Sequence, residues 1–142
     1  MRKVSACIDA NVLISAIAFG GKPLEVLERA LNREFHVVTG PNILSEVRRN
    51  LLGKLALNPR LVDAFLDDFT DVSSVLVPQG NIHSISHPGD NLVLELALIG
   101  GCDVIVTGDR KHLLPLSPFK GVIIEPPSKF LVRLRHYESH ND

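Results

Sequence analysis

Two aspartates that each end an apolar segment have the residue type and position expected for metal-ion chemistry. Asp9 directly follows the run Val4–Ile8, and Asp109 follows Val104–Gly108 near the other end of the chain. Continuous apolar runs are typical of parallel strands that are buried on both faces. Ligands of open parallel sheets bind at the carboxyl ends of the strands. Carboxylates that gather there repel one another, so the pattern indicates a divalent cation between them.

Each of these acids also has a purely structural interpretation. Asp9, Asp90 and Asp109 each directly precede a predicted helix, and aspartate is a favoured N-cap because its carboxylate accepts unpaired backbone N–H groups. Taken singly, capping is the favoured interpretation for all three. Glu46 lies off the apolar stripe of its predicted helix, where a solvated glutamate is the default. Glu95 lies within a very apolar helix and needs a partner or a polar cleft, which gives it at most a supporting role.

The elements that must position these acids alternate along the chain. The pattern predicts strands near 4–8, 35–39, 75–77, 103–107 and 122–125. It predicts helices near 11–18, 24–32, 41–55, 61–70 and 91–100, a short helix from 110, and a last helix from 127. This alternation favours a three-layer α/β/α domain with a mostly parallel central sheet. We expect one domain over residues 1–135 and a polar, frayed tail over 136–142.

Composition narrows the class of protein. The 142 residues are 45% hydrophobic and 22% charged, which is ordinary for a globular domain. No apolar stretch approaches the roughly 20 residues of a membrane span, and Asp9 interrupts the first apolar run too early for a signal peptide. We therefore expect a cytoplasmic protein in which Cys7 and Cys102 are buried and reduced. The net charge of −1 gives no global basic field, so any contact with nucleic acid must rest on a local patch.

Four acids and their polar neighbours follow one order along the whole chain. The motifs are Asp9-Ala-Asn11 with Ser15 on the next helix, the mid-chain Glu46, Pro88-Gly89-Asp90-Asn91, and Thr107-Gly108-Asp109. This ordered set resembles the PIN domain family of metal-dependent nucleases. Within that family it is most similar to the short prokaryotic toxin components of toxin–antitoxin pairs. The resemblance runs from Val4 to about Pro126 and includes the spacing of all four acids.

The resemblance implies an activity and a set of site residues. It implies an endoribonuclease that holds one or two Mg²⁺ or Mn²⁺ ions with four acids: Asp9, Glu46, Asp90 and Asp109. It further implies that Asn11 and Ser15 line the cleft and that Thr107 supports the last aspartate. Hard oxygen ligands suit both ions, and metals about 4 Å apart would activate water and neutralise charge on a phosphodiester. An RNA substrate, an antitoxin partner and a homodimer are also implied.

Histidines occupy two positions where this family often has acids. Relatives often carry Asp-Pro-Asp-Asp-Asn before the apolar helix, whereas this chain has His87-Pro88-Gly89-Asp90-Asn91. Relatives often have a further aspartate three residues after the last motif, where this chain has His112. Because imidazole suits transition metals better than magnesium, one hypothesis is that His87 or His112 shifts the preference toward manganese or a softer ion. The alternative is that both are loop histidines without a metal role, and the number of ions stays open.

Basic residues beside two of the acids are candidates for RNA contact. Arg48 and Arg49 follow Glu46, and Arg110 and Lys111 follow Asp109. Such clusters would bind phosphates on either side of a scissile bond, although Lys and Arg in helices equally often only solvate a surface. With 5% aromatic residues and no tryptophan, platforms for base stacking are scarce, which favours recognition of the RNA backbone.

Two other functions compete with the nuclease. A PIN fold that has lost catalysis and serves as an RNA- or protein-binding module would explain the acids that are missing at positions 87, 89 and 112. A phosphatase of the haloacid dehalogenase type would also place Asp9 at the end of its first strand. That family needs an acid two residues further on, where this chain has Asn11.

Overall fold

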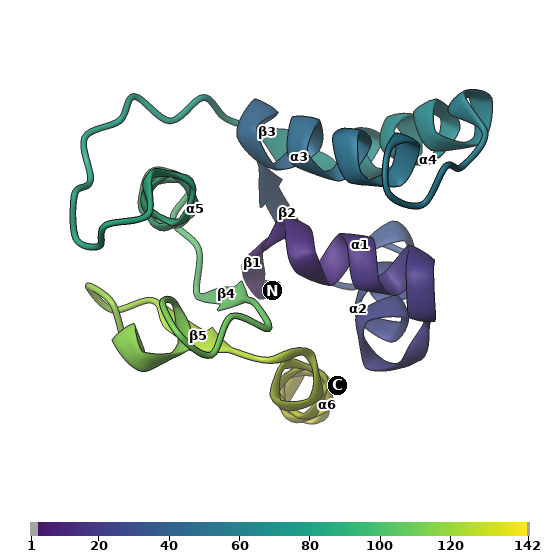
Figure 1. Cartoon of the computed structure of the whole chain (residues 1–142). Helices are drawn as coiled ribbons and strands as arrows, with labels where there is room; N and C mark the ends of the chain where they lie inside the picture. The colour runs from purple at the N-terminus through teal and green to yellow at the C-terminus, as the bar shows by residue number, and fades with distance from the viewer. Residues whose placement is uncertain (1–2, 142) are drawn as a thin grey trace.

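The computed structural model describes residues 3–141, with side chains described through residue 137. Strands and helices alternate along the chain, as expected (Figure 1). The strands are β1 (Ser5–Ile8), β2 (His36–Thr39), β3 (Ser73–Val75), β4 (Val104–Val106) and β5 (Ile123–Glu125). The helices are α1 (Ala10–Phe19), α2 (Gly21–Leu31), α3 (Pro41–Leu52), α4 (Pro59–Asp71), α5 (Pro88–Ile99) and α6 (Pro127–Asn141), with a short 3-10 helix η1 (Leu114–Leu116).

The described residues form one five-stranded sheet in the order β3-β2-β1-β4-β5. Every pairing is parallel, so the predicted α/β class is confirmed and the sheet is parallel throughout. The chain runs from β1 to β2 and β3 on one side and to β4 and β5 on the other. The strand order therefore reverses between β1 and β4, the place where open parallel sheets bind ligands. Because Ile8 pairs with Val106, the next residues, Asp9 and Thr107, leave the sheet side by side.

Helices cover both faces of this sheet. Figure 1 shows α5 on one side of the strands and α1, α2 and α6 on the other. All four residues of β1 are buried, as a central strand between two helical layers requires. Helix α5 packs on β1, β2 and β4 and buries Val93, Leu94 and Leu96 against them. The two cysteines are buried and form no disulfide, as expected.

Several boundaries differ from the sequence-based expectations. Helix α2 begins at Gly21 rather than 24, and α3 ends at Leu52 rather than 55. Helix α5 begins at Pro88 rather than 91, because proline suits the first helical turn, where its missing N–H is not needed. Strand β3 begins at Ser73 rather than at 75, since pairing with β2 starts directly after α4 ends. Helix α6 continues to Asn141, through residues that we expected to be a frayed tail. The last residue of that expected tail, Asp142, lies outside the described residues.

Within residues 3–141, no single helix is long and apolar enough to cross a membrane. The bent pair α1 and α2, whose axes differ by 108°, satisfies the length and composition criteria only when the two helices are taken together.

Candidate active site at the carboxyl end of the sheet

Asp9 is a buried carboxylate whose two oxygens are both engaged. Its side chain is the N-cap of α1, where Oδ1 accepts a hydrogen bond from the Ala10 N–H at 2.8 Å. Its Oδ2 accepts from Thr107 Oγ1 at 2.7 Å and from Asn11 Nδ2 at 3.0 Å. The residue is only 6% exposed. Asp9 is thus the N-cap of α1, as expected, and its three hydrogen bonds fix the orientation of its carboxylate.

The ionised form of Asp9 is disfavoured in this environment. Burial, together with the negative charges of Asp90 and Glu46, raises the pKa of Asp9 from 3.8 to about 6. The hydrogen bonds from Thr107 and Ala10 act in the opposite direction without cancelling this effect. Among the residues whose side chains are described, no lysine or arginine forms an ion pair with Asp9. A cation from solution would relieve the repulsion that the described side chains leave uncompensated.

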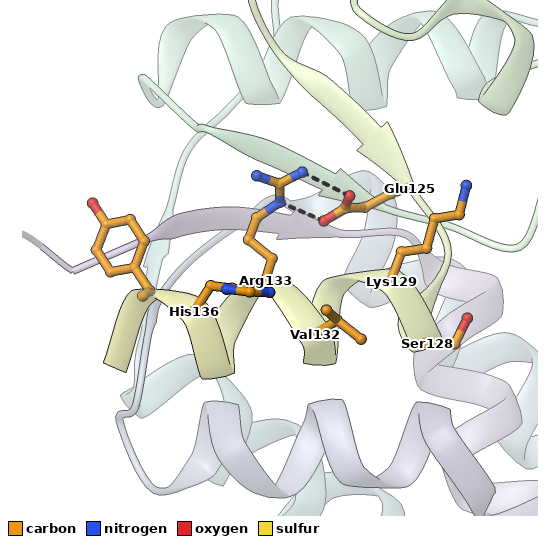
Figure 2. A pocket seen from close by; sticks show the side chains of 7 residues that line it. Glu125, Ser128, Lys129, Val132, Arg133 and His136 are labelled. Carbon is orange, nitrogen blue, oxygen red and sulfur yellow. Dashed lines mark hydrogen bonds and ion pairs between the residues drawn. The ribbon is translucent and has the colours of Figure 1, made fainter. Parts of the chain in front are cut away.

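Glu125 is a buried carboxylate at the same end of the sheet, and unlike Asp9 it has a basic partner. It ends β5 and is 6% exposed, as buried as Asp9. Figure 2 shows the Arg133 guanidinium of α6 facing this carboxylate with two parallel contacts. Arg133 Nε lies 2.7 Å from Oε2 and its second nitrogen donates to Oε1 at 3.0 Å. These contacts raise the pKa of Arg133. The hollow of about 780 Å³ beside this pair is lined mainly by α6, away from the acids of β1 and β4.

Asp109 is held by the backbone of the turn that follows it. Its Oδ1 accepts hydrogen bonds from the N–H groups of Lys111 and His112, and its own N–H donates to Thr107 Oγ1. Partial burial alone would raise the pKa of Asp109, but those backbone N–H groups and His112 together hold it below its usual range. Asp109 therefore caps a turn, as expected, although a 3-10 helix rather than an α-helix follows it. Thr107 bridges Asp9 and Asp109 through one hydroxyl.

Asp90 lies inside the first turn of α5, and its expected role as an N-cap is wrong. His87 occupies the N-cap position, because Pro88 begins the helix three residues earlier than expected. Burial and the charge of Asp109 raise the pKa of Asp90, while His112 and His87 lower it less strongly. His112 Nδ1 lies 3.9 Å from Asp90 Oδ2 and 3.4 Å from Asp109 Oδ2. The carboxylate of Asp90 is therefore free of α-helix capping and turned toward the other acids.

A cavity of about 210 Å³ joins α1, α3 and α5 around these acids. Three of the four predicted ligands line it: Asp9, Glu46 and Asp90. Asn11 and His87 line it as well, whereas Asp109 adjoins Asp90 and His112 next to it. Glu46 is exposed and points away from the buried stripe of α3, as its place on the helix predicted.

One lining residue was not anticipated from the sequence. Asn42, in the first turn of α3, lines the cavity, and its Oδ1 is buried without a hydrogen-bond partner. Its place directly after the strand-end run Thr39-Gly40-Pro41 is the signal that would have indicated it. This oxygen and the carboxylates of Asp9, Glu46 and Asp90 are hard donors of the type that Mg²⁺ or Mn²⁺ prefers, and all four residues line the same cavity.

The remaining predicted residues lie outside the cavity lining. Ser15 is half-buried on α1, one turn beyond Asn11. Arg48 Nε lies 3.1 Å from Asp63 of α4 in an exposed ion pair, and Arg49 is exposed on the same helix. Lys111 is exposed, and so is Arg110, which lines a different hollow.

Glu95 has a structural role that the sequence did not show. Its carboxylate is buried and accepts hydrogen bonds from the N–H groups of Gln79, Gly80 and Asn81. These contacts lower the pKa of Glu95. One turn earlier on the same helix, the buried Asn91 exchanges two hydrogen bonds with the backbone of Ile85. The side chains of α5 thus hold the polar loop of residues 78–87, at the end of which His87 lines the cavity.

Comparison with known proteins identifies the family. The sequence model of the PIN domain matches residues 5–111, three quarters of the chain. This chain belongs to the PIN domain family. The family that the motif order resembles is thereby confirmed, and nothing supports the haloacid dehalogenase alternative. PIN domains are generally nucleases that use divalent metals. No curated protein matches this PIN domain in sequence.

Solved structures share the fold of this PIN domain. One is the crystal structure of VapBC2 from Rickettsia felis bound to a DNA fragment from their promoter, at a TM-score of 0.62 and 14% identity. That similarity covers 87% of this chain and 98% of the other. Another is PAE2754 from Pyrobaculum aerophilum, also at a TM-score of 0.62, with 19% identity over 94% of this chain and 90% of the other. At such identities the likeness shows the fold alone.

Proposed function

We propose that this PIN domain is a metal-dependent endoribonuclease that hydrolyses RNA phosphodiester bonds. The observation that carries the proposal is the state of Asp9. Its carboxylate is buried, its pKa is raised to about 6, and the charges around it are those of Asp90 and Glu46. A chain that keeps such a group without a basic partner retains an unfavourable arrangement that bound metal would correct.

The metal ligands in this proposal are Asp9, Glu46, Asp90 and Asp109, with Mg²⁺ or Mn²⁺ as the ion. Bound there, the ion would activate water and offset the charge that develops on the scissile phosphate. The chain contributes rigidity, because Thr107 and Asn11 fix the Oδ2 of Asp9 before any ion arrives. Ser15 would contact substrate from α1 rather than hold the ion.

We also propose RNA as the substrate, held through its backbone. Arg110 and Lys111 are exposed beside Asp109, where they would contact phosphate, and Arg49 would do so from α3. Arg48 is the weakest of the four candidates, since its guanidinium is engaged by Asp63.

The fold it shares with VapBC2 supports the proposal that this protein is the toxin component of a toxin–antitoxin pair, acting in the cytoplasm as a homodimer. The second candidate function is a catalytically weakened binding module. His112 favours it, because an imidazole rather than a further carboxylate lies beside Asp90 and Asp109.

One experiment separates these functions. Single-stranded RNA is incubated with the protein in Mn²⁺, Mg²⁺ or EDTA, next to Asp9→Asn and the exposed-surface control Glu28→Gln. We expect cleavage in metal that EDTA and Asp9→Asn abolish and that the control retains. RNA binding without cleavage in any metal, by protein whose fold is confirmed by circular dichroism, would support the binding module and reject the nuclease.

A further inference from the structure

Two imidazoles and a carboxylate converge where the loop of residues 78–87 enters α5. His87 precedes the helix, Asp90 lies in its first turn, and His112 comes from the turn after β4. Each offers a ligand atom, and these atoms all lie within 4.8 Å of one another. The rings of His87 and His112 are in contact, with centroids 3.8 Å apart.

The spacing of these atoms is close to that of a metal coordination shell. Donors about 2.1 Å from an ion lie roughly 3.0–3.4 Å from each other in octahedral or tetrahedral geometry. His112 Nδ1 lies 3.4 Å from Asp109 Oδ2 and 3.9 Å from Asp90 Oδ2. The separations within the set reach as far as 4.8 Å, so side-chain rotations must draw the donors together around an ion. The exposed or half-buried positions of these residues permit such rotations.

The backbone that carries these donors is fixed from both sides. The hydrogen bonds of Asn91 to Ile85 hold the chain just before His87, and Glu95 holds the start of the same loop. The backbone N–H of His112 donates to Asp109 Oδ1, which fixes the other imidazole. A site whose ligands are held before the ion arrives binds it at a smaller entropic cost.

We propose that His87, Asp90 and His112, with Asp109 beside them, form a binding site for a first-row transition-metal ion in preference to Mg²⁺. Two nitrogen donors and one or two carboxylates are a donor set that suits Mn²⁺, Co²⁺ or Zn²⁺, whereas Mg²⁺ prefers oxygen ligands and water. The consequence for catalysis depends on the proposed nuclease function, but the binding of metal does not. Asp90 belongs both to the histidine cluster and to the four predicted acidic ligands. An ion held by the histidines would therefore share a ligand with an ion bound by the four acids.

Metal titration of the purified protein tests the proposal. Co²⁺ is followed by its visible absorption and Zn²⁺, Mn²⁺ and Mg²⁺ by calorimetry, for wild type, His87→Ala, His112→Ala and the control His83→Ala. His83 is an exposed histidine of the same loop and lies outside the cluster. We expect His87→Ala and His112→Ala each to weaken Co²⁺ and Zn²⁺ binding by at least ~10-fold, while Mg²⁺ binding and the control stay unchanged.

The outcomes separate this inference from the proposed nuclease. If His112→Ala binds Co²⁺ and Zn²⁺ as tightly as wild type does, the proposed transition-metal site is rejected, even if Asp9-dependent RNA cleavage is found. Histidine-dependent binding without any RNA cleavage would support the site and reject the nuclease. A wild-type protein that binds none of these ions would overturn the inference.

Discussion

Replacing Asp9 by Asn should stabilise the metal-free protein at neutral pH. The folded-state pKa of Asp9 is about 6 against 3.8 for the free side chain. A carboxyl whose pKa rises on folding binds protons more tightly in the native state, so its ionisation opposes folding above pH 3.8. Ionisation of Asp9 thus lowers the free energy of unfolding. This loss grows as the pH rises from 4 to 6 and reaches about 3 kcal/mol at pH 7.5, since each pKa unit corresponds to about 1.4 kcal/mol. Asparagine carries no such charge.

The amide still caps α1, because asparagine and aspartate are equally good N-caps. The amide Nδ2 takes the place of Oδ2, which accepts from both Asn11 and Thr107. The hydrogen bond with Asn11 is lost at a cost of about 1 kcal/mol, whereas the Thr107 hydroxyl can turn and accept from the amide. At pH 7.5 in EDTA we therefore expect the free energy of unfolding of Asp9→Asn to exceed that of wild type by about 2 kcal/mol. At pH 5 the charge penalty falls to about 1.5 kcal/mol, so the advantage shrinks by half or more.

Urea unfolding followed by circular dichroism at several pH values, in EDTA and in Mn²⁺, measures these differences. Metal should reverse the order of the two proteins, because ion at about 100 times its Kd adds roughly 2.7 kcal/mol to wild type alone. Glu28→Gln, an exposed change on α2, serves as the control for the removal of one negative charge. A wild type that remains the more stable protein at pH 7.5 in EDTA, with a difference independent of pH, would refute the account of Asp9 as an uncompensated carboxylate.

Four further substitutions test other parts of the site. Thr107→Val keeps the shape of a fully buried side chain but removes the hydroxyl that serves both strand-end aspartates, and should cost about 2–4 kcal/mol in urea unfolding; a loss under 1 kcal/mol would contradict that role. Glu95→Ala should leave the protein folded but speed amide hydrogen exchange at 79–81, and unchanged exchange there would show that other contacts hold the loop. Lys111→Ala should weaken RNA binding and reduce the slope of log affinity against log salt by about one phosphate contact, whereas Arg48→Ala should change neither. Equal effects of the two substitutions would contradict the proposal that only Lys111 contacts phosphate.

The alternation of elements and the place of the strand-end acids were readable from the sequence because both follow from local pattern. The apolar runs before Asp9 and Asp109 predicted two parallel strands whose carboxyl ends carry acids, and the register shows that these strands are neighbours in the sheet. The family follows from the same motifs, since their order along the chain is preserved over residues 5–111.

Side-chain partners that are distant in the sequence were not readable. The capping of Asp90 was mispredicted because local preference favours aspartate over histidine at an N-cap, yet Pro88 fixes the start of α5. The role of Glu95 depends on where a loop folds back, and the pairing of Arg48 with Asp63 depends on how α3 packs on α4. Neither arrangement has a signal in local periodicity.

The central position of β1 fixes when the site can form during synthesis. Strand β1 pairs on one edge with β2, but its other edge waits for β4, which lies at 104–106. Until then the Oδ2 of Asp9 lacks the Thr107 hydroxyl, and neither Asp109 nor His112 exists to face Asp90. A nascent chain therefore exposes the free edge of β1 until β4 has been made, and the acids come together only after that strand has paired.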